Sequence, residues 1–205
     1  MMNASIHHHG QPSEPSRSRP FGICSWSILL ALCLAFTGCG SPKSYYLLTP
    51  TGLPPTGGGM GIGVGPVAVA AYLDRPNLVF QETGNRLALA ESHRWAGDLE
   101  DNIASVVATN LGRIKGTGNV RTYPWADDNQ LRYQISIDVR QMHGTANGDA
   151  FIDAAWRVYS LPDRRMITSK SWSGTEPLVA DGYDELAAAQ SRLLARLSDR
   201  IASSL

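Results

Sequence analysis

Apolar and polar residues alternate along the second half of the chain in the way that predicts long β-strands with one buried face. The clearest case is residues 131–144, where every second residue is apolar: Tyr133, Ile135, Ile137 and Val139. A period of two with polar residues between is typical of a strand with one wet side. Residues 149–161 and 164–178 are predicted as two further strands after short turns. Together the three segments predict an antiparallel meander.

Shorter strands are predicted before this meander. They cover residues 44–50, 60–76, 78–83, 86–91 and 119–124. Gly84-Asn85 separates two of these strands, and such a pair is a strong hairpin signal. The Pro- and Gly-rich segment 51–59 is predicted as a loop.

Two segments instead carry apolar residues at spacings of three and four, which is typical of amphipathic helices. The first helix is expected to begin at Ser92 and to end at Gly116, with this apolar set: Trp95, Leu99, Ile103, Val106, Val107, Leu111 and Ile114. The second lies in residues 181–205, with this stripe: Leu186, Leu193, Leu194, Leu197 and Ile201. The order predicts a single α+β domain, a mixed or antiparallel sheet with two amphipathic helices packed on one face.

The N-terminal residues 1–38 have the pattern of a secretory signal. Arg17 and Arg19 precede an apolar stretch whose strongest part is the nine residues Ile28–Phe36. A membrane-spanning helix needs about 20 apolar residues, so a permanent anchor is the weaker interpretation. His7–His9 would be removed with this segment, which argues against a metal site there.

Cys39 follows the small residues Thr37 and Gly38, and this order resembles the bacterial lipobox, although Phe36 stands where leucine is usual. The lipobox cysteine is acylated and becomes the mature N-terminus, so the resemblance implies a lipid-anchored protein. Gly40 follows, where an aspartate would retain a Gram-negative lipoprotein in the inner membrane. Outer-membrane sorting is therefore expected. An ordinary secretory signal with a chance cysteine is the alternative.

The domain boundaries expected from these features are a signal peptide over 1–38, a lipidated N-terminus with a short strand and loop over 39–60, and the folded domain over 61–205. No cysteine follows Cys39, so the expected mature chain has no internal disulfide. Lys and Arg number 18, as do Asp and Glu. This balance gives no indication of a nucleic-acid partner.

Candidate catalytic or cofactor residues were weighed against plain structural roles. The segment 61–65, "GIGVG", has the glycines of a phosphate loop, but Pro66 and a strand follow it instead of a helix. His93 lies near three acidic residues, Asp98, Glu100 and Asp101, whose place at the start of a helix is explained by the helix dipole. His143 has no partner motif, and no nucleophile–base pattern is present. No catalytic residue, cofactor or metal ligand is therefore predicted.

The last predicted helix also carries basic residues at intervals of four: Arg192, Arg196 and Arg200. They could contact lipid head groups or an acidic partner. A solvated helix face opposite the leucine stripe is the favoured explanation. The four tryptophans after residue 90 are assigned to core or edge packing, with an interface anchor as the alternative for one of them.

Several sequence segments, taken in order, resemble the corresponding segments of one protein family. They are "SPKSYYLL" (41–48), "GVGPVAVAAYLDRPNLV" (63–79), "RWAGDLEDNI" (94–103), "YQISIDVRQMHG" (133–144) and "DAAWRVYS" (153–160). The chain is similar to the PqiC/YmbA lipoproteins, the ABC-type transport auxiliary lipoprotein components. The similarity covers essentially all of the chain after Cys39.

This resemblance implies a non-enzymatic, periplasm-facing outer-membrane lipoprotein that serves an intermembrane lipid transport system. The implied partners are an MCE-domain protein of the PqiB type and, through it, a PqiA-like inner-membrane permease or an ABC transporter. Ring-shaped homo-oligomers are also implied, because MCE tubes are rings. Two alternatives remain: a lipid-anchored periplasmic hydrolase and a purely structural envelope lipoprotein.

Overall fold

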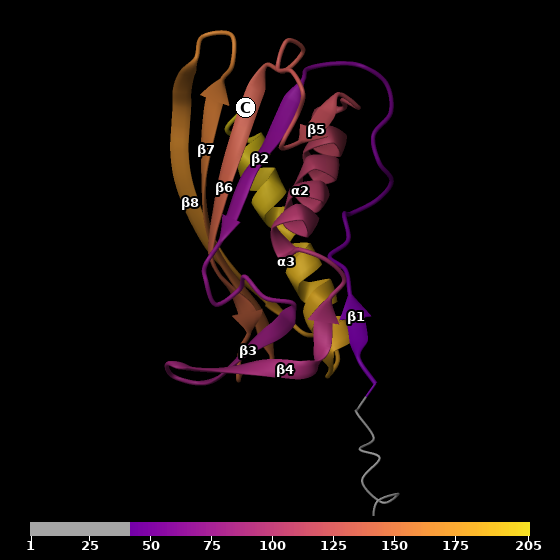
Figure 1. Ribbon diagram of the computed structural model, residues 1–205, viewed down its shortest axis with the longest axis vertical. Helices are drawn as coiled ribbons and strands as arrows, with labels where there is room; N and C mark the ends of the chain where they lie inside the picture. The colour runs from indigo at the N-terminus through magenta and orange to yellow at the C-terminus, as the bar shows by residue number, and fades with distance from the viewer. Residues whose placement is uncertain (1–41) are drawn as a thin grey trace, which may run out of the picture. The chain divides into compact units, whose positions relative to one another are not determined.

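A computed structural model describes residues 42–205, and its strands join in one curled mixed sheet (Figure 1). The signal segment 1–38, Cys39 and His7–His9 lie outside the described residues. The strands are β1 (Ser44–Tyr46), β2 (Ile62–Val69), β3 (Asn77–Thr83), β4 (Arg86–Trp95), β5 (Val120–Thr122), β6 (Tyr133–Gly144), β7 (Asp149–Ser160) and β8 (Arg165–Pro177).

The long strand β6 is the centre of the sheet. On one side it pairs antiparallel with β7 along its whole length, and β7 pairs with β8, so the predicted meander is confirmed. On the other side β6 pairs in parallel with β2 from Tyr133 to Val139, and then with β3 where Phe80 lies opposite Gly144. The predicted β3–β4 hairpin is also confirmed. β1 adds to β4, and β5 adds to β2, both in parallel.

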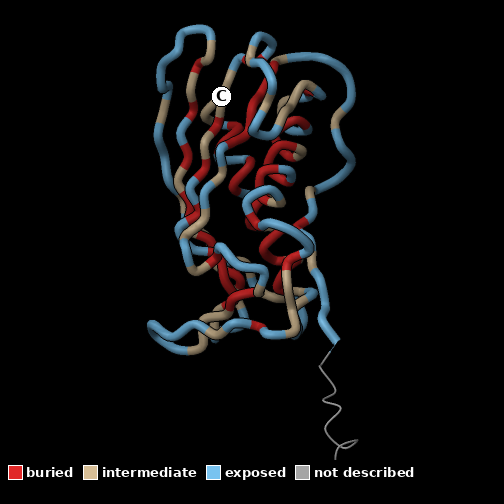
Figure 2. The backbone as a smooth tube through the Cα atoms, viewed as in Figure 1, coloured by how far each residue is buried: buried red, intermediate tan, exposed pale blue. Residues whose placement is uncertain are grey.

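Two helices, α2 (Leu99–Lys115) and α3 (Tyr183–Ala202), cover one face of the sheet and pack against each other. α2 lies on β2 and β5, whereas α3 lies on β6, β7 and β8. The predicted leucine stripe of α3 is buried, as is the inward-facing set of β6. Figure 2 shows buried segments along both helices and along the strands of the sheet. The predicted α+β fold is confirmed.

The predicted start of the first helix is wrong. Glu91–Trp95 continue strand β4, and α2 begins at Leu99 after the N-cap residue Asp98. The cause is tertiary, because these β4 residues pair with β1 on one side and with β3 on the other. Gly97, at φ 123°, then turns the chain into the helix. The predicted end at Gly116 is confirmed, since Gly116 caps α2 in the left-handed region at φ 61° and ψ 38°.

The cap of α2 gives a direct stability prediction. We expect Gly116→Ala to lower the free energy of unfolding by about 1–2 kcal/mol, because an L side chain is disfavoured in the left-handed region. No atom lies within 4 Å of the position of the added Cβ, so the cost is conformational only. Urea denaturation would measure it.

Gly58→Ala is the matched control. The space around Gly58 is equally open, but its φ lies outside the left-handed region. We expect no loss of stability there, and an equal loss in both variants would contradict the conformational explanation.

Candidate functional site

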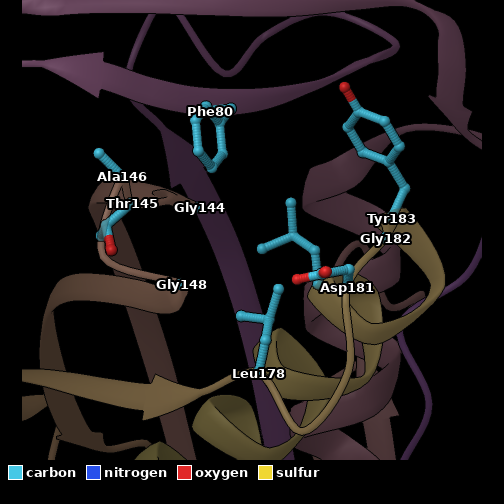
Figure 3. A pocket seen from close by; sticks show the side chains of 10 residues that line it. Phe80, Gly144, Thr145, Ala146, Gly148, Leu178, Asp181, Gly182 and Tyr183 are labelled. Atoms are coloured by element: carbon cyan, nitrogen blue, oxygen red, sulfur yellow. The ribbon is translucent and has the colours of Figure 1, made fainter.

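An apolar groove of about 360 Å³ lies where β3, the β6–β7 turn and the beginning of α3 meet (Figure 3). Phe80 lines it from β3, Leu178 from the segment that leads into α3, and Tyr183 and Leu186 from the first turn of α3. The turn over 144–148 supplies small residues. Among the lining residues only Asp181 carries a charge at neutral pH.

Gly144 determines how closely the groove walls approach each other. A Cβ built on this residue would lie 2.7 Å from the ring of Phe80 and 3.3 Å from Leu186. A side chain at position 144 would therefore displace both walls. The turn is fixed to the loop before α3, because the backbone N–H of Leu178 donates to the carbonyl of Gly148 at 3.0 Å.

Aromatic side chains connect the groove to the first described strand. The Tyr183 ring stacks on the His93 ring, with centroids 3.9 Å apart and planes at 20°. His93 Nδ1 in turn forms a hydrogen bond with the Tyr46 hydroxyl at 2.7 Å. The chain segment that follows Cys39 therefore reaches the groove through two side-chain contacts. We call Tyr46, His93 and Tyr183 the aromatic bridge.

A network of ion pairs holds α3 to the end of β8 beside the groove. Arg192 contacts Glu176 at 2.9 Å and Glu185 at 2.7 Å, and Arg196 contacts Glu176 at 3.2 Å. The hydrogen bond from Arg192 lowers the pKa of Glu185 below its ordinary value, so this carboxylate stays charged in mildly acidic solution.

The Arg196 guanidinium also lies 5.2 Å from the centroid of the Trp172 ring. Two of the three arginines predicted as a solvated stripe thus serve internal contacts. Arg200 is exposed and forms no ion pair with another described residue.

The structure separates the residues that were weighed as catalytic. His93 belongs to the aromatic bridge, and Asp98 stands at the N-cap position of α2 without a side-chain capping hydrogen bond. Glu100 accepts a hydrogen bond from the backbone of Val69 at 3.2 Å. His143 is buried, and its Nδ1 lies 3.1 Å from the carbonyl oxygen of Gly144. Within residues 42–205, no group of three His, Cys, Asp or Glu side chains is placed to hold a metal ion.

The glycines of the segment 61–65 allow close packing at the start of β2. A Cβ on Gly61 would overlap the Gln130 backbone, and one on Gly63 would lie 2.8 Å from the ring of Trp125. Close approach of neighbouring chain segments explains these glycines without a bound phosphate. The structural interpretation of this motif is thereby supported.

Sequence reasoning did not find the groove. Phe80, Gly144 and Tyr183 are far apart in sequence, and none belongs to a local binding motif. None of the helices that the structure describes is both long and apolar enough to span a membrane.

The sequence profile described as "ABC-type transport auxiliary lipoprotein component" matches residues 46–202. The chain belongs to this family. The matched region contains the aromatic bridge, the groove and both described helices. Membership of the transport auxiliary family gives the protein an accessory role associated with transport, and it makes the chain a lipoprotein of the cell envelope.

Solved structures of other proteins share the fold. One, described as an uncharacterized protein, has a TM-score of 0.67 at 21% sequence identity, over 80% of this chain and 98% of its own. A second, from Xanthomonas campestris, has a TM-score of 0.61 at 18% identity, over 78% of this chain and 92% of its own. A search of curated proteins gives no significant match.

The aromatic bridge of this auxiliary lipoprotein can be tested by removing one hydroxyl. We expect Tyr46→Phe to lower the free energy of unfolding by about 1 kcal/mol, because the hydrogen bond to His93 is lost while the ring remains. Thermal denaturation of the variant would measure it.

Tyr45→Phe is the control for this substitution. Tyr45 is the neighbouring residue of β1, it is 62% exposed, and its hydroxyl forms no hydrogen bond with another described residue. We expect stability to be unchanged. A loss in this variant as large as in Tyr46→Phe would refute the specific role of the bridge.

Proposed function

We propose that this protein is a non-enzymatic accessory subunit of an intermembrane lipid transport system, anchored by Cys39 in the outer membrane, where it docks an MCE-domain protein of the PqiB type. The observation that carries the proposal is the match to the transport auxiliary family over residues 46–202. The MCE partner and the outer membrane come from the resemblance of the sequence to the PqiC/YmbA lipoproteins and from Gly40.

The lipid anchor defines the orientation of the domain. Cys39 lies three residues before Pro42 in the sequence, so the proposed anchor tethers the domain through the short segment that leads into β1. The end of the domain with β1 and the β3–β4 hairpin, which we call the anchor end, therefore faces the membrane. β5 and the β7–β8 turn lie at the opposite end (Figure 1).

The opposite end is the surface that we assign to the MCE partner. It carries Tyr123, which is 52% exposed and packs edge-on against Trp125, with ring centroids 5.4 Å apart. Exposed aromatic side chains held by a neighbour are common anchors of protein interfaces. A ring of copies would match the ring symmetry of an MCE tube, whose attached permease of the PqiA type or ABC transporter lies in the inner membrane.

Docking, and not catalysis, is the role that the arrangement of side chains supports. His93 and His143 are each engaged with non-acidic neighbours, and the groove holds a single carboxylate among apolar walls. A hydrolase would need a nucleophile, its base and an orienting group within hydrogen-bond reach of one another.

The anchor can be tested by intact-mass analysis of protein extracted from membranes. We expect the mature protein to begin at Cys39 and to carry the added mass of acyl groups. In Cys39→Ala these groups are expected to be absent and the protein to leave the membrane fraction, since the acyl chains supply the anchoring. An unacylated wild-type protein would overturn the proposed anchor.

Docking can be tested by measuring binding of the acylated protein, in detergent, to the MCE-domain protein encoded beside it. We expect Tyr123→Ala to weaken this binding at least about fivefold, because an interface aromatic is removed. Tyr45→Ala, which removes an even more exposed tyrosine at the anchor end, is expected to leave it unchanged. No affinity in the wild type would reject the docking role, and a larger effect of Tyr45→Ala would reverse the orientation.

A further inference from the structure

The groove lies at the anchor end of the domain, and its lining is mainly apolar (Figure 1). Val179 follows the lining residue Leu178, and its side chain is 80% exposed. A large aliphatic side chain held this far out in a short loop gains nothing from the fold of its own domain, since it is not removed from water. The loop 178–182 thus extends the apolar surface of the groove outward.

The hairpin on the other side of the groove has the same character. Phe80 lies opposite Ala88 in the β3–β4 pair, so it shares a face with Ala88. Leu87 and Leu89 flank Ala88 and therefore lie on the other face of the hairpin, beside the buried Val79, and they are 38% and 42% exposed. The hairpin therefore places Phe80 in the groove and leaves two further apolar side chains partly exposed.

We infer that this groove accommodates one acyl chain of a phospholipid from the membrane in which Cys39 is anchored. The inference rests on the proposed anchor, because the short segment between Cys39 and β1 keeps the mouth of the groove close to the bilayer. The aromatic bridge connects the same segment to Tyr183 in the groove wall.

The size and polarity of the groove suit a single chain. Its volume of about 360 Å³ is at the small end of the range for ligand sites, too small for a whole phospholipid with two chains. Phe80 and Leu186 form the inner apolar walls, where methylene groups leave water. Asp181 is exposed at the mouth, where the polar head of the lipid would remain in contact with water and with neighbouring head groups.

Photo-labelling tests the occupant directly. The full-length acylated protein is placed in vesicles of phosphatidylethanolamine and phosphatidylglycerol that contain a phospholipid with a photoreactive group at the end of one acyl chain. After irradiation, mass spectrometry locates the labelled peptides. We expect labels in residues 78–83 and 178–186.

Ala146→Trp is the test variant, because Ala146 is an exposed residue of the turn that lines the groove, and an indole there would fill the mouth. We expect labelling of both groove peptides to fall at least about fivefold. Ala126→Trp adds the same side chain to an exposed position in the loop after β5 and is expected to leave labelling unchanged. Val179→Asp, a surface substitution at the mouth, is expected to lower labelling as well.

The outcomes separate this inference from the proposed function. Unlabelled groove peptides in a protein whose Cys39 is acylated would overturn the inference and leave the anchor intact; a groove filled by the anchor's own chain or by a second protein copy would give this result. Labelling that persists equally in Ala146→Trp and Val179→Asp would also overturn it. A protein without acyl groups would refute the anchor. Labelling of that protein in the same vesicles would still show whether a phospholipid acyl chain enters the groove.

Discussion

Two strands, β2 and β3, share one edge of β6, and the position of the hairpin and of the groove depends on this constraint. β2 occupies this edge up to Val139, and β3 takes it over at Gly144. Because β3 meets β6 at this end only, the β3–β4 hairpin projects from the sheet instead of continuing it. The space beneath the hairpin is closed by the beginning of α3, and the groove is what this closure leaves open.

The parts of the fold that could be predicted from sequence are those set by local periodicity. The alternation in 131–144 and the leucine stripe of α3 both describe how one face of an element meets the core, and both are correct. The boundary between β4 and α2 could not be predicted in this way. Trp95 and Leu99 are four residues apart, which fits a helix, yet Trp95 is held in a strand by its pairing with Tyr46 of β1.

The site escaped prediction for a related reason. Its walls come from segments that only the topology brings together, and the informative residue, Gly144, ends a strand without any motif around it. Proximity in sequence was also misleading for His93, whose acidic neighbours lie in the next element while its real partners come from β1 and α3. Arg192 was assigned to solvent because its partner Glu176 lies 16 residues away on β8.

The attachment of β1 has a mechanical consequence. β1 is only three residues long and runs parallel to β4, so tension applied through its N-terminal side would load the inter-strand hydrogen bonds in shear. The Tyr46–His93 contact resists the same displacement from the side. Slippage of this short strand would release His93, on which Tyr183 stacks. Tension on the N-terminal segment would therefore disturb the wall of the groove before it disturbed the buried core.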